Sequence, residues 1–449
     1  MPSEPASPTC HERRLERLER NHERLVERLA SGAHASTHQD GTRRLGLELE
    51  RFVYDNSAAG PVGYDGPRGV GRLLEGMRRF YGPDQLVMID GFLAGFAGEV
   101  TVGDEAVGIT VSLEPAAQLE CSVGPSASVA ALLGAVEAFD EQVSAAAQDM
   151  GCDFSLVPRG YNPWISSPED LPLIPKERYA LMDAYLSRTG RYARDMMRAS
   201  ASTQVSVDHG DEADALAMYR LAIALGPLLS FLCDNAPVWR GCGADEAPRM
   251  VRSRIWEQVD PARCGTVPHT FDEGFGFEAY AAWLENVCPI LFTDARGTTI
   301  PTPDATEGDI MCGRDLAPAE VTHMLSMVFP DTRWKGFSEI RVADSLPPRL
   351  AAGYTALIKG IFYDDGAFAA TRGLLAGADE ATVARAWKAL QEDGWDAAVY
   401  GRPMGELADE LVSIARGGLE GPAGLPGETG LLEGIASLWG ERRVPRDLD

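Results

Sequence analysis

The stretch LGLELERF, residues 45–52, places leucine at 45, 47 and 49 and glutamate at 48 and 50. Side chains along a β-strand point alternately to opposite faces, so Glu48 and Glu50 share one face while Leu47 and Leu49 share the other. The leucine face can enter a core and leave two carboxylates about 7 Å apart on the opposite face. The stretch therefore predicts a half-buried strand with an acidic face.

Three further strand-like segments repeat this alternation. Their polar members are Gln118 and Glu120 in residues 112–123, Gln204, Ser206 and Asp208 in residues 202–208, and Glu339 and Arg341 in residues 336–344. One such strand is usually only half-solvated, but four acidic or amide faces in one chain are more informative. If the faces converge, their carboxylates repel one another unless cations lie between them. Oxygen ligands with hardly any His or Cys nearby suit Mg²⁺ or Mn²⁺, and such magnesium usually also binds nucleotide phosphates. The pattern therefore indicates a magnesium–nucleotide site.

The remaining chain alternates short strand-like and helical segments. Expected strands are residues 45–53, 86–89, 106–113, 118–123, 203–207 and 337–342. Expected helices are residues 69–80, 128–150, 175–190, 212–235, 277–285, 318–328, 349–362 and 380–392. Neither strict βαβ alternation nor an internal repeat stands out. This favours an α+β fold with helices around a largely antiparallel sheet.

Both ends of the chain differ from this middle part. Residues 11–31 place leucines at close to helical spacing among arginines and glutamates, which predicts an amphipathic helix for packing or an oligomer contact. Residues 416–430 are rich in Gly and Pro, which predicts a flexible linker. We therefore expect a charged helical extension over 1–40, a main domain over 41–412, and a linker with a tail over 413–449.

Composition limits the classes of partner. The 449 residues include 67 Asp and Glu against 41 Lys and Arg, a formal net charge of −26, which disfavours binding to nucleic acid. The sequence contains no run of about 18 apolar residues, so we expect no membrane span. The polar N-terminus argues against export. The eight cysteines form no CxxC pair or zinc-like grouping, which is typical of reduced cytoplasmic thiols. We expect a cytoplasmic protein, as a monomer or a homodimer.

Several familiar catalytic motifs are missing from the sequence, namely the Walker A loop, GxGxxG, HExxH and GxSxG. The chain has only four lysines, so the binding of anions falls mainly to arginine, whose planar fork binds carboxylates and phosphates. Candidate cations are Arg252 and Arg254 in VRSRIW, and Arg333, Lys335 and Arg341 in DTRWKGFSEIR.

Five stretches taken together resemble one known family. They are GLELERF (46–52), SLEPAAQLECSVG (112–124), MMRASASTQVSVD (196–208), the long MVRSRIWEQVDPARCGTVPHTFDEGFGFEAYAAW (250–283) and FPDTRWKGFSEIRVADSLP (329–347). In this order they resemble the glutamate–cysteine ligase family, in the branch shared by plants and many bacteria. The third stretch also resembles actinobacterial members that make γ-glutamylcysteine for ergothioneine. The downstream thiol stays open between ergothioneine, glutathione and neither.

This resemblance implies a fold and a set of site residues. The fold is a saddle-shaped, mainly antiparallel sheet related to that of glutamine synthetase, with ATP, metal and glutamate on its concave face. The implied metal ligands are Glu48, Glu50, Glu120 and Glu339, with Glu114 as support for a turn. The implied substrate-binding residues are Arg252, Trp256 and Gln204. Arg341 and Lys335 are implied catalytic residues, and Arg341 and Arg333 are implied ATP-binding residues.

The sequence departs from the plant members of this family at two places. Plant members carry two glycines where this chain has Ala116 and Ala117, which affects a tight turn. They usually carry histidine where this chain has Arg254, which bears on affinity or on the choice of amine.

The resemblance implies an ATP-dependent ligation of the glutamate γ-carboxylate to the amine of cysteine through a γ-glutamyl phosphate. Mg²⁺ would be the metal, with Mn²⁺ as a substitute. The sequence identifies no base for the ammonium group of cysteine. The alternatives are a ligase for a different amine, a phosphotransferase for a small metabolite, and a silent protein that binds glutamate or nucleotide.

Overall fold

The computed structural model describes residues 9–35 and 42–448. Its centre is a ten-stranded sheet, in which every pairing between named strands is antiparallel. The strands in spatial order are β13 (Thr332–Trp334), β14 (Ser338–Asp344), β8 (Ser202–Val207), β1 (Leu45–Asp55), β6 (Leu119–Ser126), β5 (Glu105–Leu113), β4 (Phe92–Val102) and β3 (Leu86–Ile89). Short strands β2 (Gly60–Pro61) and β7 (Phe154–Val157) pair with the far end of β1. The predicted α+β fold with a mainly antiparallel sheet is confirmed.

The four strands with acidic or amide faces are direct neighbours in this sheet. In the register of β1, Glu48 lies opposite Gln204 of β8 and Ser122 of β6, and Glu50 lies opposite Glu120. Residues directly opposite each other in an antiparallel pair point to the same face. The polar side chains predicted from four separate segments therefore gather on one face.

The opposite face of the sheet is apolar and carries the core. Leu47, Leu49, Val205 and Ile340 are all at most 2% exposed. This face is covered by helices α2 (Val70–Met77), α3 (Val129–Asp149), α6 (Glu212–Leu232) and α11 (Pro348–Phe362). Burial of one strand face fixes the strand register, because a slip by one residue would turn the leucines to the polar side.

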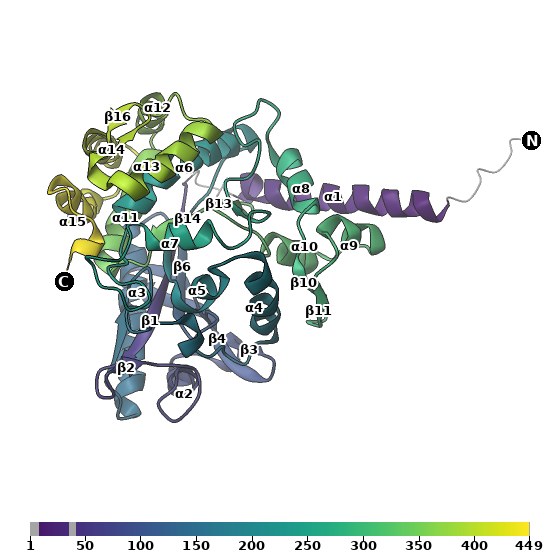
Figure 1. Cartoon of the computed structure of the whole chain (residues 1–449), viewed down its shortest axis with the longest axis horizontal. Helices are drawn as coiled ribbons and strands as arrows, with labels where there is room; N and C mark the ends of the chain where they lie inside the picture. The colour runs from purple at the N-terminus through teal and green to yellow at the C-terminus, as the bar shows by residue number, and fades with distance from the viewer. Residues whose placement is uncertain (1–8, 36–41, 449) are drawn as a thin grey trace, which may run out of the picture.

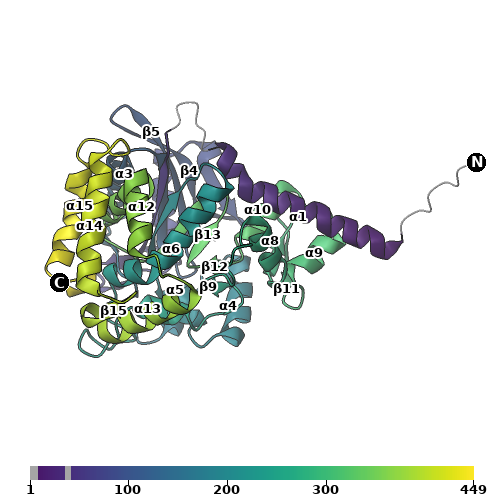
Figure 2. The same ribbon diagram turned by 90° about the horizontal axis from the view of Figure 1, so that it is seen from above.

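The C-terminal segment forms two packed helices, α14 (Met404–Glu420) and α15 (Glu428–Gly440), so the predicted flexible linker and tail are wrong. Both helices pack on α11, and Figure 2 shows them together on the side away from α1. A Cβ atom on Gly418 would collide with the carbonyl group of Gly360 in α11. These glycines therefore allow two helices to approach closely, a use of glycine that composition alone does not distinguish from a linker.

The predicted amphipathic helix near the N-terminus is confirmed as α1 (Cys10–Ala35), which projects from the body of the protein in Figure 1. Its Leu25 and Leu29 are buried, whereas Leu15 nearer the tip is 50% exposed. The helix packs on α8 (Phe277–Glu285), α9 (Glu307–Gly313) and α10 (Pro318–Leu325). The other parts of the predicted 1–40 extension, residues 1–8 and 36–40, lie outside the described residues.

The polar face of the sheet is bordered by α4 (Glu177–Thr189), α5 (Ala193–Ala199) and α7 (Val251–Trp256). The other elements are α12 (Asp365–Leu374), α13 (Glu380–Asp393) and the strand pairs β9 (Cys264–Gly265) with β12 (Phe329–Pro330), β10 (Ile290–Thr293) with β11 (Thr299–Thr302), and β15 (Ala398–Val399) with β16 (Arg402–Pro403). Helix α6 is long and apolar enough to cross a membrane by composition, but 83% of its most apolar window is buried inside the protein. Such burial is typical of a core helix.

Candidate active site

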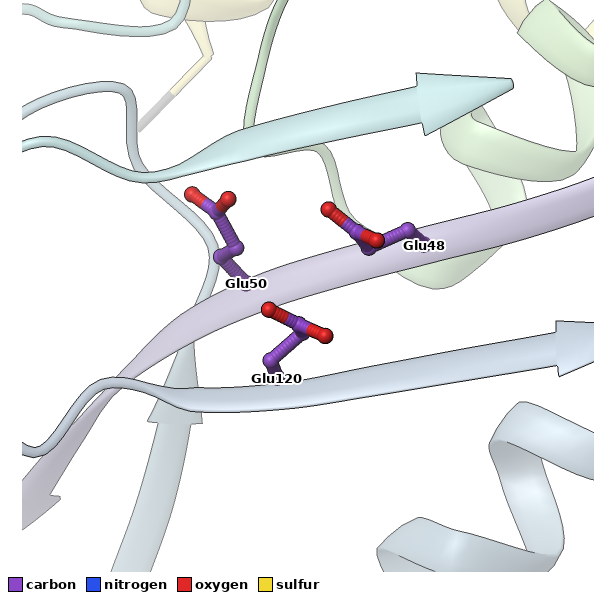
Figure 3. A group of neighbouring side chains, drawn as sticks. All are labelled: Glu48, Glu50 and Glu120. Carbon is purple, nitrogen blue, oxygen red and sulfur yellow. The ribbon is translucent and has the colours of Figure 1, made fainter. Parts of the chain in front are cut away.

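Three glutamates from two neighbouring strands point into one space (Figure 3). Glu48 and Glu50 come from β1 and Glu120 comes from β6, and one carboxylate oxygen of each lies within 4.8 Å of the others. The hydroxyl group of Ser122 lies 3.2 Å from an oxygen of Glu48 and 3.2 Å from an oxygen of Glu120. The structure thus brings together three of the four residues predicted as metal ligands, here called the carboxylate trio.

The electrostatics of the carboxylate trio favour a bound cation. Burial raises the pKa of Glu48 well above its ordinary value, and repulsion by Glu120, Glu339 and Glu50 raises it further. Burial also raises the pKa of Glu50, although the nearby Arg252 partly offsets this shift. A divalent cation would relieve this repulsion, and an all-oxygen donor set suits magnesium. The residues present therefore fit the metal that the family resemblance implies.

Glu339, the fourth predicted ligand, is surrounded by cations. Its Oε2 atom accepts hydrogen bonds from Arg333 Nε (2.8 Å) and Arg341 Nη1 (2.8 Å), and its Oε1 atom accepts one from Lys335 Nζ (2.7 Å). Burial alone would raise the pKa of Glu339, but these three cations hold it well below its ordinary value. In this structure Glu339 lies outside the carboxylate trio and positions the cation cluster, which we define as Arg333, Lys335 and Arg341. Its role as a metal ligand stays a prediction.

Gln204 connects the cation cluster to the carboxylate trio. A register shift between Ile340 and Ala343 of β14 interrupts the pairing with β8 opposite Gln204, and bulges of this kind re-aim side chains. Arg341 Nη1 donates to Gln204 Oε1 (2.6 Å), and Gln204 Nε2 donates to Glu50 Oε1 (3.1 Å). The amide orientation is therefore fixed by an arginine on one side and a carboxylate on the other.

Arg252 of α7 offers a buried guanidinium group to this space. Its side chain lies over the ring of Trp256 at 5.6 Å, and the residue is only 5% exposed. Burial lowers the pKa of Arg252, and attraction by Glu50 partly offsets this. Within the described ranges, its buried Nε atom has no hydrogen-bond partner. A buried arginine donor in need of an acceptor is well suited to a carboxylate ligand.

The carboxylate trio, the cation cluster, Gln204, Arg252 and Trp256 line one pocket of about 250 Å³, here called the carboxylate pocket. Its wall also includes residues that the sequence did not single out, namely Lys176, Arg178, Tyr179, Met182, Met196 and Met197. Lys176 was visible as one of four lysines, but nothing in its flanking sequence connects it to the acidic strands. Glu114 shapes the turn as predicted, since its carbonyl accepts from Ala117 N (3.0 Å), and it also lines the pocket.

The two departures from the plant sequences have different consequences. Ala117 has a left-handed backbone (φ 69°), the conformation that glycine adopts without strain, so the turn is kept at some cost. Arg254 donates to the carbonyl oxygens of Arg249 (2.8 Å) and Gln391 (2.8 Å). Its guanidinium group therefore binds backbone beside the site and does not line the carboxylate pocket.

Two further hollows adjoin this site. The first, here called the glycine groove, has a volume of about 490 Å³ and continues along the polar face past Gly46, Gly98, Gly108 and Gly124. The second, here called the tryptophan cleft, has a volume of about 390 Å³ between Trp256 and Trp387. The tryptophan cleft shares Arg252, Trp256, Phe329 and Arg341 with the carboxylate pocket.

Comparisons with known proteins agree with this geometry. The chain is 28% identical over 428 residues to a chloroplastic glutamate–cysteine ligase of Arabidopsis thaliana, covering 92% of this chain and 77% of that one. It is 28% identical over 431 residues to the chloroplastic enzyme of Solanum lycopersicum, covering 93% and 76%. A crystal structure of the Francisella tularensis glutamate–cysteine ligase in complex with AMP has a similar fold, with a TM-score of 0.52, 10% identity, and coverage of 90% of this chain and 83% of that one. The model of glutamate–cysteine ligase family 2 matches residues 44–412, so this chain belongs to that family.

Proposed function

We propose that this protein joins the γ-carboxylate of glutamate to the amine of cysteine at the expense of ATP, giving γ-glutamylcysteine, ADP and phosphate. The observation that carries this proposal is the single pocket in which the carboxylate trio, the cation cluster and the buried Arg252 face one another. Such a pocket can hold a metal-bound phosphoryl group next to a substrate carboxylate. The names of the relatives support the same activity.

Arg252 is the proposed anchor for a carboxylate of glutamate. Its guanidinium group is buried next to Trp256, and its Nε donor points to no acceptor among the described residues. A carboxylate bound there would satisfy this donor and offset the charge of a buried arginine. The γ-carboxylate can then reach toward Gln204 and Arg341, which line the same pocket.

The glycine groove is the proposed site for the base and ribose of ATP. The glycines leave the sheet backbone bare, so a flat ring can lie directly on it, and Phe337 adds an apolar wall. The groove reaches Gly46 and Ser122, which flank the carboxylate trio along β1 and β6. A nucleotide in the groove would therefore direct its phosphates toward the trio and the cation cluster.

The cation cluster would stabilise the transfer of the phosphoryl group. An oxygen of the glutamate γ-carboxylate attacks the γ-phosphorus of ATP, the bond from that phosphorus to the ADP oxygen breaks, and an acyl phosphate forms. Arg341, Lys335 and Arg333 are held near this position by Glu339 and would donate to the phosphoryl oxygens. The carboxylate trio would hold Mg²⁺, which when bound neutralises charge on phosphate oxygens.

A direct test is to incubate the purified protein with ATP, Mg²⁺ and glutamate, with and without cysteine, and to measure phosphate and product mass. We expect cysteine-dependent phosphate release and a product with the mass of γ-glutamylcysteine. Phosphate release that is indifferent to any amine would contradict the proposal and favour a phosphotransferase.

The similarity of residues 196–208 to ergothioneine-pathway members supports ergothioneine as the downstream thiol.

A further inference from the structure

Asp331 lies in the tryptophan cleft on the same side of the sheet as the cation cluster. Its backbone oxygen accepts a hydrogen bond from Arg341 N (3.0 Å). This bond extends by two residues the register in which Arg333 lies opposite Glu339, so Asp331 lies opposite Arg341. Because cross-strand partners point to the same face, the carboxylate of Asp331 faces the side on which Arg333, Glu339 and Arg341 lie. It lines the cleft together with Arg252 and Arg341, both of which also line the carboxylate pocket.

The described acids that line the tryptophan cleft are Asp331, Glu257 and Glu380, and of these only Asp331 is not exposed. The carboxylate trio is needed for the metal, and Glu339 is ion-paired with three cations. Glu257, which also lines the cleft, is exposed and accepts a hydrogen bond from Gln391 Nε2 (2.6 Å). Asp331 is partly buried, receives one long hydrogen bond from Thr266 Oγ1 (3.5 Å), and forms no salt bridge within the described ranges.

The surroundings of Asp331 suit a group that takes up a proton. Burial and the nearby Glu257 raise its pKa to about 6, while Arg252, Thr266 and Arg341 limit the rise. Such a carboxylate is ionised at neutral pH yet more basic than an ordinary aspartate, which is the property that general-base catalysis requires.

We propose that the tryptophan cleft receives the amine substrate and that the Asp331 carboxylate accepts the proton that its ammonium group must lose. This inference rests on the proposed ligase function. The freed lone pair of the nitrogen attacks the acyl carbon, the bond from that carbon to the phosphate oxygen breaks, and phosphate leaves with the electron pair. The second proton lost by the nitrogen passes to the departing phosphate, and Asp331 returns its own proton to water in the open cleft.

The test compares two acceptors in the full-length Asp331→Asn variant. Cysteine carries an ammonium group, whereas hydroxylamine is largely neutral at neutral pH and needs no base. We expect ligation of cysteine to fall by about 10²- to 10⁴-fold, the usual contribution of general-base catalysis. Formation of glutamyl hydroxamate should stay close to that of the unaltered protein. The matched control Asp304→Asn changes an exposed aspartate outside these pockets and should leave both reactions unchanged.

The pH profile gives a second readout that a merely structural role would not move. In the unaltered protein, kcat/KM for cysteine should rise as the pH passes about 6, because Asp331 must lose its proton to act as a base. This limb should vanish in Asp331→Asn and return at reduced activity in Asp331→Glu.

Three results would overturn the assignment of Asp331. The first is an equal loss of the cysteine and hydroxylamine reactions in Asp331→Asn, and the second is full ligation of cysteine in that variant. The third is a Glu257→Gln variant that loses ligation of cysteine but keeps the hydroxylamine reaction. An unaltered protein that forms neither product would contradict the ligase function itself, so the two failures are distinguishable.

Discussion

The substitution Glu50→Gln removes one charge from the carboxylate trio and keeps the size of the side chain. In the structure, Glu50 Oε2 accepts from Ser202 N (2.7 Å) and Oε1 accepts from Gln204 Nε2 (3.1 Å). A glutamine has one oxygen, so one of these donors would face an NH₂ group. Gln204 cannot easily turn its amide to adapt, since its oxygen already accepts from Arg341.

The expected effects on folding and on catalysis differ greatly in size. One unsatisfied hydrogen bond costs about 1–3 kcal/mol in the free energy of unfolding. Removing a carboxylate whose pKa is raised by burial and by the nearby Glu120 offsets part of this cost. Loss of a metal ligand removes several kcal/mol of stabilisation of phosphoryl charge, and about 4 kcal/mol corresponds to a 10³-fold lower turnover.

The assay is ADP formation as a function of Mg²⁺ concentration, with urea unfolding measured on the same preparations. We expect Glu50→Gln to fold, to require much more Mg²⁺ and to turn over about 10³-fold more slowly. The matched control is Glu99→Gln, which changes an exposed glutamate on β4 of the same sheet. An unchanged Mg²⁺ dependence in Glu50→Gln would refute the assignment of the carboxylate trio as the metal site.

Three further predictions address the rest of the molecule. Glu428→Gln should lower the free energy of unfolding by about 3–5 kcal/mol in urea titrations, because it leaves the buried Lys359 without its ion-pair partner. Gly46→Val should raise the KM for ATP about tenfold, a loss of about 1.4 kcal/mol in binding, because the new side chain projects into the glycine groove. The free energy of unfolding of this variant should stay close to that of the unaltered protein. Burial lowers the pKa of His22, but its two glutamate partners on α8 raise the pKa above 6.5 overall. The contact between His22 and these glutamates therefore stabilises α1 fully below pH 6.5 and weakens as the pH rises through the raised pKa. Amide hydrogen exchange in α1 should accordingly speed up at higher pH, and no change would count against this contact.

The parts of the site that the residue pattern alone predicted are those set by strand alternation, whereas Arg252 and Trp256 were implied by the family resemblance. The alternation of Glu48 and Glu50 with leucines predicted both the core face and the acidic face of β1. The same alternation predicted the face on which Glu120 lies in β6. Asp331 lies within the quoted stretch DTRWKGFSEIR, two residues before Arg333, but the strand alternation was followed only over residues 336–344.

Other features depend on tertiary contacts that local patterns do not carry. The register shift that aims Arg341 at Gln204 arises between two strands more than a hundred residues apart in the chain. The pocket wall formed by Lys176 depends on where α4 packs. The segment around Gly418 has the glycine-rich composition of a flexible linker. Only its packing against Gly360 of the opposing helix shows that it is a helix contact and not a linker.

The central claim is that the γ-carboxylate of glutamate becomes an acyl phosphate in the carboxylate pocket. The most direct measurement uses glutamate labelled with a heavy oxygen isotope in its γ-carboxylate, followed by mass spectrometry of the released phosphate during ligation of cysteine. Transfer of one labelled oxygen to each phosphate is the predicted result, because the attacking carboxylate oxygen leaves with the phosphoryl group. Phosphate without label, formed alongside γ-glutamylcysteine, would contradict the mechanism.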